Sequence, residues 1–268
     1  MYSRLNPFRI LRRTMRTLRW KWVIGGQTAN KSKHKEKGWL ARWHRNITWG
    51  IRIGLLLLAL DIFYVITIWP SWSDFNHGPV AKSEFIKLYQ TKRKADRKLP
   101  RLQWRTVPLS KISPHIQRAV IVAEDGRFYW HSGFDVIVLK DAMDYNLEKL
   151  EMKYGASTIS QQTVKNMFFS ASRNPLRKWH ELIFTVSMEF FVPKERILET
   201  YLNIAEFGHG IFGVEAASQY YWGIPASKLS LEQATELAAT LPSPKKHNPK
   251  TRTEYFTRRA AKIYRHMQ

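Results

Sequence analysis

The sequence predicts an all-α protein with one N-terminal transmembrane helix, and three observations support this fold class. One long apolar run lies near the N-terminus. Proline and N-cap signals recur along the rest of the chain, where they mark the starts of helices. No stretch is rich in strand-forming residues, and no segment repeats. The length of 268 residues suffices for one well-buried domain and a tail.

Basic residues are concentrated at the N-terminus of this chain, whose net charge is +23. Residues 1–46 hold thirteen Lys and Arg against the single acid Glu36. Such a tail is typical of the cytoplasmic side of a membrane anchor, and a nucleic-acid contact is the alternative. We expect a basic cytoplasmic tail at 1–46, a transmembrane anchor at 47–70 and an extracytoplasmic domain at 71–268. The absence of cysteine excludes disulfides, thiol catalysis and Cys-ligated zinc.

The apolar run from Ile53 to Trp69 is the predicted anchor. At 1.5 Å per residue it spans roughly 26 Å, near the short end of what crosses a bilayer. Asp61 costs roughly 2.5–3.5 kcal/mol there, and each Leu, Ile, Phe or Val returns about 0.3–0.6 kcal/mol, so insertion is favoured. The positive-inside rule then puts the N-terminus in the cytoplasm. A buried core helix is the alternative for the run, and Asp61 is either functional or a packing contact.

The first segments after the anchor differ in their helical signals. Residues 71–100 are polar and mixed, and we interpret them as a linker or peripheral subregion. Ser113 and Pro114 form an N-cap followed by proline at the first helical position. The helix that they start gives way to a turn at Gly126, so Glu124 falls at the end of this helix.

The remaining helices are also predicted from caps and prolines. They run from Asp135 to about Leu150, from Gly155 to about Phe168, from Asn174-Pro175, from Pro193, after Gly213, over 231–241 and from about Thr253. Ser230 and Gln233 have the spacing of a capping box. The helix after Pro175 is amphipathic, with an apolar face made of Leu176, Trp179, Ile183, Val186 and Phe190.

Two adjacent carboxylates, Glu124 and Asp125, follow an apolar run that begins at Ala119. A carboxylate that emerges from apolar surroundings has its pKa raised toward neutrality, which suits general base catalysis. Glu124 is therefore the candidate catalytic residue.

Two further helices carry groups suited to a charged substrate. Ser157, Gln161 and Lys165 recur every fourth residue, so we expect them on one helix face that suits a sugar and a phosphate. A solvated helix face is the alternative. Arg177 and Glu181 lie four apart, beside Lys178 and away from the apolar face, with Glu189 on the same side. They form either a surface ion pair or an anion site, because Arg binds phosphate oxygens bidentately. The Met167–Phe169 triplet between these helices either enters lipid or packs in the core.

Five motifs occur in order along the chain. They are Glu124-Asp125-x-x-Phe128-x-x-His131-x-Gly133, Gly155-Ala-Ser-Thr-Ile-Ser-Gln-Gln-x-x-Lys-Asn166, Arg177-Lys178-x-x-Glu181, Lys194-x-x-Ile197-Leu-Glu-x-Tyr-Leu-Asn203 and Gly208-x-Gly210-x-x-Gly213-Val-x-x-Ala-Ala217. Over roughly 75–250 the chain resembles the peptidoglycan glycosyltransferases, a lysozyme-like family found alone or as the first domain of bifunctional penicillin-binding proteins. Its short length and single anchor are similar to those of the monofunctional biosynthetic transglycosylases of Gram-negative bacteria.

The resemblance implies a lysozyme-like helical fold and lipid II as the substrate. The enzyme would join lipid II disaccharides into β-1,4 glycan with inversion and release undecaprenyl pyrophosphate. Glu124 would be the general base, and Lys165, Arg177 and Lys178 would stabilise the pyrophosphate, with Mg²⁺ as a candidate divalent metal and no certain cofactor. Glu181, the second catalytic residue, would orient these cations or a metal. The expected substrate-binding residues are Asp125, Phe128, His131, Ser157, Thr158, Gln161, Gln162, Lys165, Asn166, Arg177 and Lys178.

The expected location is the bacterial inner membrane, with the catalytic domain in the periplasm. The expected partners are lipid II, the growing glycan strand, membrane lipids and proteins of cell division or elongation, with no nucleic acid. A lysozyme-like enzyme that cleaves glycan is one alternative, although cleavage needs neither a row of cations nor an anchor. A membrane-tethered nucleic-acid-binding protein is another, although no DNA- or RNA-binding module is recognisable.

Overall fold

The structure is a computed structural model that describes residues 39, 42–149, 157–169 and 175–268. The chain divides into two compact units, Met1–Trp69 and Pro70–Gln268. The expected basic tail lies mostly outside the described residues, and the division at residues 46 and 70 stays a prediction.

A helix of residues 42–67 forms the described part of the first unit. Among the described residues, one region, within Arg42–His77, is long and apolar enough to cross a membrane, and its most apolar 18-residue window has a mean hydropathy of 2.2. Most of its large apolar side chains are exposed, among them Leu55, Leu57 and Phe63. Exposure of this kind fits a helix that contacts lipid rather than a core helix of a soluble protein.

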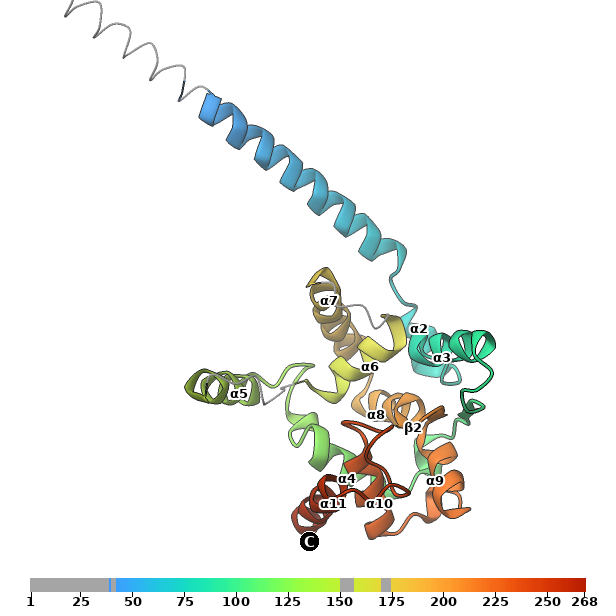
Figure 1. The fold of residues 1–268 in the computed structure, drawn as a ribbon. Helices are drawn as coiled ribbons and strands as arrows, with labels where there is room; N and C mark the ends of the chain where they lie inside the picture. The colour runs from blue at the N-terminus through green and yellow to red at the C-terminus, as the bar shows by residue number, and fades with distance from the viewer. Residues whose placement is uncertain (1–38, 40–41, 150–156, 170–174) are drawn as a thin grey trace, which may run out of the picture. The chain divides into compact units, whose positions relative to one another are not determined.

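The second unit is built mainly from helices (Figure 1), which confirms the all-α prediction. The α-helices are α2 (Trp72–His77), α3 (Glu84–Ala95), α4 (Pro114–Glu124), α5 (Val136–Lys149), α6 (Ile159–Phe168), α7 (Pro175–Phe191), α8 (Lys194–Ile204), α9 (Val214–Trp222), α10 (Leu231–Thr240) and α11 (Glu254–Met267). Short 3-10 turns are η1 (Leu109–Lys111), η2 (Phe128–Trp130) and η3 (Ala226–Lys228). Helix α4 packs against α10 and α11, whereas α6 packs against α7 and α8.

Several helices begin where the sequence predicts. The side chain of Ser113 accepts the first-turn N–H of α4, with proline at the next position. Asp135 accepts the N–H groups of the first turn of α5, and Ser230 and Gln233 form the capping box of α10. Helix α6 begins later than expected, at Ile159. The expected starts at Gly155 and Asn174 lie outside the described residues.

The second unit also contains a small three-stranded sheet, which the sequence did not predict. Strand β3 (Ile211–Phe212) pairs in parallel with β1 (Gln103–Trp104) and antiparallel with β2 (Glu206–Gly208). Strands this short show no readable alternation of apolar and polar residues. Asn203 supports the sheet, because its side-chain amide both donates to and accepts from the backbone of Val107, at 2.9 and 2.8 Å.

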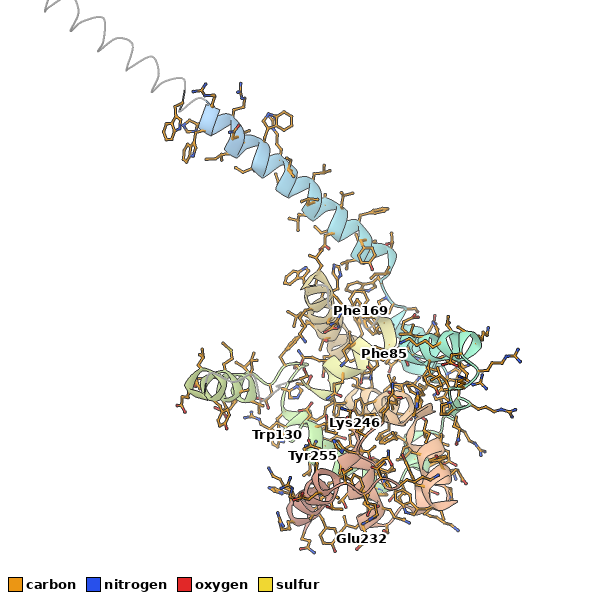
Figure 2. All side chains as sticks on the ribbon, in the orientation of Figure 1. Phe85, Trp130, Phe169, Glu232, Lys246 and Tyr255 are labelled. Carbon is orange, nitrogen blue, oxygen red and sulfur yellow. The ribbon has the colours of Figure 1, made fainter. Side chains whose placement is uncertain are left out.

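Residues 71–100 contribute buried side chains to the core although half of them are exposed, so the linker interpretation is wrong and that of a peripheral subregion fits. Ile86 and Tyr89 on α3 belong to a buried cluster that also contains Met167 and Phe212. The polar residues of α3 cover its outer face, which explains the mixed composition. Phe169 is also buried (Figure 2), so core packing is the correct alternative for the Met167–Phe169 triplet.

The apolar face of α7 is turned outward. Leu176, Trp179 and Phe190 are 58%, 53% and 81% exposed, while Glu181 on the opposite face is 3% exposed. The amphipathic helix was predicted, but the face that packs against the protein is a different one, which combines the apolar Phe184 and Met188 with buried polar residues such as Glu181. Helix α5 extends away from its neighbours (Figure 1) and also exposes apolar side chains. These are Val136, Ile137, Val138, Leu139, Met143 and Leu147, and the neighbouring Trp130 is exposed as well (Figure 2).

Candidate active site

Glu124 is the last residue of α4 and is held by two side chains from other helices. Gln162 on α6 donates to Oε2 at 3.0 Å, and Arg259 on α11 donates to Oε1 at 2.8 Å. Tyr201 on α8 donates to the Gln162 carbonyl oxygen at 3.1 Å, which turns the amide nitrogen of Gln162 toward Glu124. Elements far apart in the sequence therefore converge on this carboxylate.

The surroundings of Glu124 make its carboxyl more basic than usual. Burial raises its pKa above the ordinary glutamate value, because the charged form loses its hydration. The hydrogen bond from Gln162 and the charge of Arg259 act in the opposite direction, and the charge of Asp125 adds to the rise. A raised pKa is what a general base working near neutral pH needs.

Asp125 and His131 form a buried brace beside Glu124. One carboxylate oxygen of Asp125 lies 2.9 Å from His131 Nε2, and the other accepts the backbone N–H of Ile159 at 2.9 Å. The backbone N–H of Gly133 points to the second ring nitrogen of His131, at 3.2 Å. This bond assigns the proton to Nε2, which donates to Asp125. Both residues were predicted to bind substrate, and the structure places them in an internal network.

Three other predicted substrate contacts also lie inside the fold. Thr158 and Gln161 form the capping box of α6 and are both buried. The spacing Thr-x-x-Gln is a recognised signal for this arrangement, and the sequence interpretation missed it. Phe128 is fully buried, with the ammonium of Lys194 4.4 Å from its ring centroid. Ser157 is exposed, so the expected face of Ser157, Gln161 and Lys165 does not form as one surface.

Three cations on α6 and α7, Lys165, Arg177 and Lys178, interact with one another electrostatically, and Lys165 also interacts with Glu124. Burial lowers the pKa of Lys165, the charge of Arg177 lowers it further, and the charge of Glu124 opposes this. Burial also lowers the pKa of Lys178, as do the charges of Lys165 and Arg177. Mutual repulsion in a partly buried place favours binding of a compact anion such as a phosphate or pyrophosphate.

Glu181 lies behind these cations. Its carboxylate accepts a hydrogen bond from Arg177, and the ammonium of Lys178 lies 3.4 Å from its Oε2. The carboxylate of Glu181 is thus paired with the side chains of Arg177 and Lys178. Half-buried Asn166 lies on the same helix as Lys165.

The described residues contain no group of three or more His, Asp or Glu side chains that converges on one point. With Glu181 engaged by Arg177 and Lys178, this part of the chain does not fit a metal held by protein ligands alone. We therefore derive no catalytic step through a metal.

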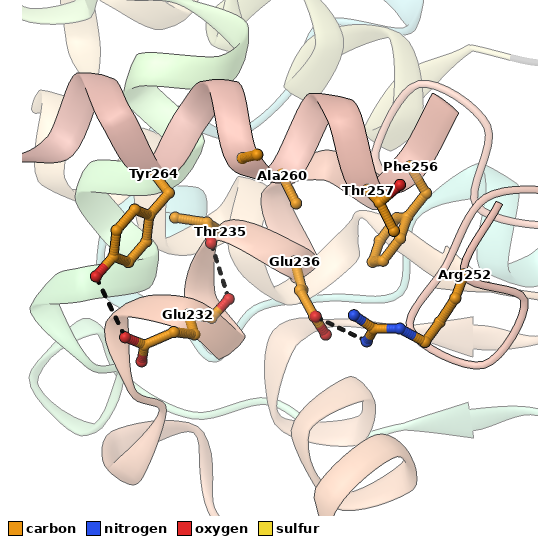
Figure 3. A pocket seen from close by; sticks show the side chains of 9 residues that line it. Glu232, Thr235, Glu236, Arg252, Phe256, Thr257, Ala260 and Tyr264 are labelled. Atoms are coloured by element: carbon orange, nitrogen blue, oxygen red, sulfur yellow. Dashed lines mark hydrogen bonds and ion pairs between the residues drawn. The ribbon is translucent and has the colours of Figure 1, made fainter. Parts of the chain in front are cut away.

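A cavity of about 310 Å³ lies elsewhere, between α10 and α11 (Figure 3). Its walls include Phe256, Ala260 and Tyr264, and its rim carries the Glu236–Arg252 ion pair at 2.8 Å. None of the predicted site residues lines it. Glu124 is the better candidate site, because its carboxylate is buried and interacts with Lys165, one of the three clustered cations.

A helical fold with a buried carboxylate and a cluster of three cations on neighbouring helices fits an enzyme that transfers glycosyl groups. Residues 92–268 match the family model described as transglycosylase, and the chain belongs to that family. It is 39% identical to the biosynthetic peptidoglycan transglycosylase of Nitrosospira multiformis over 80% of this chain and 94% of that protein. It is 41% identical to the protein of the same name from Chromobacterium violaceum, over 73% and 85% of the two chains. These matches confirm the family resemblance and the lysozyme-like fold class.

Proposed function

We propose that the protein is a membrane-anchored peptidoglycan polymerase. It joins lipid II disaccharide units into β-1,4 glycan strands and releases undecaprenyl pyrophosphate. The names of its relatives support the substrate class. The observation that carries the proposal is the buried Glu124 carboxylate, which interacts electrostatically with Lys165, together with the interaction of Lys165 with Arg177 and Lys178.

Glu124 acts as the general base. It takes the proton of the acceptor 4-hydroxyl while that oxygen attacks the anomeric carbon of the donor sugar. A carboxylate has about four lone-pair positions, so the bonds from Gln162 and Arg259 leave one on each oxygen for this proton. The new bond joins the hydroxyl oxygen to the anomeric carbon, and the bond from that carbon to the pyrophosphate breaks. One displacement inverts the configuration and needs no covalent enzyme intermediate.

Lys165, Arg177 and Lys178 stabilise the leaving group. The charge on the pyrophosphate increases as its bond to the sugar breaks, so positioned cations lower the barrier without donating a proton. Glu181 keeps Arg177 and Lys178 in place through its ion pairs. It orients the cations and does not attack the sugar.

The membrane supplies proximity between the enzyme and its lipid-linked substrate. Residues 47–70, most of which lie in the helix of residues 42–67, serve as the anchor, with residues 1–46 in the cytoplasm and 71–268 in the periplasm. The exposed apolar faces of α5 and α7 support further contact with lipid. Contacts with cell-division or elongation proteins stay a prediction.

The test is a gel of products made from labelled lipid II by the full-length protein and by Glu124→Gln. The variant is expected to fold and to make no glycan, because an amide cannot take the proton. Glu254→Gln is the matched control, since Glu254 is 82% exposed and pairs with exposed Arg258. Substantial polymer from folded Glu124→Gln rejects the assigned base. Soluble fragments from finished peptidoglycan, with no polymer from lipid II, favour the glycan-cleaving alternative.

A further inference from the structure

The C-terminal helix α11 reaches the catalytic base through one side chain. Arg259 Nη2 donates to Glu124 Oε1 at 2.8 Å and to the backbone carbonyl of Ala123 at 3.2 Å. Both contacts are on the last turn of α4, which packs against α11. The guanidinium thus bonds to two consecutive residues and fixes the end of α4 together with its carboxylate.

The contact differs from an ordinary surface ion pair. The side chains of Arg259 and Glu124 are 26% and 13% exposed, whereas those of Arg258 and Glu254 on the same helix are 71% and 82% exposed. In addition, Arg259 Nε is buried and has no hydrogen-bond partner. Burying an unpaired donor is unfavourable. The cost of burying Nε is offset by the hydrogen bonds that Nη2 of the same guanidinium makes to Glu124 and to the backbone of Ala123.

The charge of Arg259 also suits its position. A cation at the C-terminal end of a helix interacts favourably with the helix dipole, and α4 ends at Glu124. The same cation offsets the burial of the carboxylate, which would otherwise favour its protonated form. Orientation and charge compensation thus come from one side chain.

We propose that Arg259 is a positioning residue for the catalytic base. Its hydrogen bond to Oε1 fixes the orientation of the Glu124 carboxylate. Its positive charge favours the ionised carboxylate, the form that accepts a proton. This makes α11 part of the active site. The inference rests on the proposed role of Glu124 in glycan synthesis.

The charged and titratable groups around Glu124 come from several elements. Asp125 follows it in the chain, Lys165 faces it from α6, Tyr201 from α8 and Arg259 from α11. Asp125 raises the pKa of Glu124, and Arg259 lowers it. Loss of the Arg259 charge therefore raises the pKa of Glu124 further. The base is then protonated over a wider range, so activity is lost at a higher pH on the acidic side.

The test compares Arg259→Gln with Arg259→Lys in the full-length protein, using kcat and kcat/KM for polymerisation of lipid II across pH. Gln keeps donors and loses the charge, whereas Lys keeps the charge. On the acidic side of the pH–rate profile, the limb where the rate falls is expected to lie about one pH unit or more higher for Arg259→Gln than for the wild type. This is the shift of a carboxylate that loses a neighbouring cation. The limb for Arg259→Lys should stay near that of the wild type. Because Arg259 acts through Glu124, kcat should fall more than KM changes.

Arg258→Gln is the matched control and should behave as the wild type, since its side chain is exposed on the same helix. A purely structural role would lower the plateau and leave the limb in place, so an unmoved limb in folded Arg259→Gln overturns the inference. If Arg259→Gln unfolds, a wild-type limb and plateau in Arg259→Met overturn it as well. Absence of polymer from the wild type, or polymer from folded Glu124→Gln, instead counts against the proposed function.

Discussion

Asp125 Oδ2 accepts the backbone N–H of Ile159 at 2.9 Å, and this bond ties the end of α4 to the first turn of α6. Glu124 directly precedes Asp125, and Gln162 lies one helical turn after Ile159. The bond therefore holds the C-terminal end of α4 close to the first turns of α6, where Gln162 can reach Glu124. The geometry around the proposed base is set by the protein before any substrate binds.

Replacing Asp125 with Ala is expected to destabilise the fold and to reduce glycan synthesis. The change leaves the N–H of Ile159 and the ring of His131 without their acceptor inside the protein. Each lost hydrogen bond to a charged group costs about 1.5–3 kcal/mol, so loss of both should lower the free energy of unfolding by about 3–6 kcal/mol. Urea unfolding measures it, and Asp141→Ala is the control because Asp141 is exposed on α5. Equal stability of both variants would contradict the bracing role.

Glycan synthesis should decline on the acidic side at a pH above the usual range of a glutamate. Only the ionised form of Glu124 accepts a proton, and burial raises the pKa of this carboxyl. As the pH falls through that raised pKa, the base is neutralised and the rate drops. Initial rates from acidic to neutral pH, on protein shown to remain folded, measure the limb. A limb at the ordinary glutamate value would show that burial does not control the base.

Inorganic pyrophosphate is expected to bind at Lys165 and Lys178, with an affinity that falls as the pH rises. The pKa values of both ammonium groups are lowered, so they lose their charge at a lower pH than exposed lysines do. Lys165→Met should weaken binding about tenfold or more, the loss of one charge-assisted contact. Calorimetric titration tests this, with exposed Lys262→Met as the control. Equal affinity of the two variants would move the anion site away from α6.

Gly213 and Gly223 give a matched pair of stability predictions. Both have a positive φ, of +82° and +69°, which costs a residue with a Cβ about 1–2 kcal/mol. A Cβ at Gly213 would also lie 2.7 Å from the Asn203 carbonyl oxygen, whereas one at Gly223 meets nothing within 4 Å. Gly213→Ala should therefore be clearly less stable than Gly223→Ala in thermal unfolding. Equal melting temperatures would mean that the sheet next to Asn203 shifts freely.

Local sequence signals predicted much of the fold, because caps and prolines act within one turn of a helix. The capping box of Ser230 and Gln233 is an example. The same kind of motif at Thr158 and Gln161 was interpreted as a substrate surface, since a polar pair serves either purpose. The structure brings Gln162, rather than Gln161, to Glu124.

Other features depend on contacts that local patterns do not contain. Periodicity predicted one apolar face of α7, but it does not tell which face packs against protein, and Glu181 is buried beside Phe184 and Met188 instead. Arg259 carries no sequence signal at all, because its partner Glu124 is 135 positions away. A basic, amphipathic helix near a chain end is ordinary, and only the fold shows what one of its cations touches.

The distance in sequence between Glu124 and Arg259 determines when their contact forms during folding. Contacts between distant positions form slowly, since a long loop must close before they stabilise anything. The hydrogen bonds of Asn203 to Val107 likewise bridge 96 positions. A partly folded chain therefore has helices but no assembled Glu124–Arg259 pair, and activity should appear only with the final cooperative folding step.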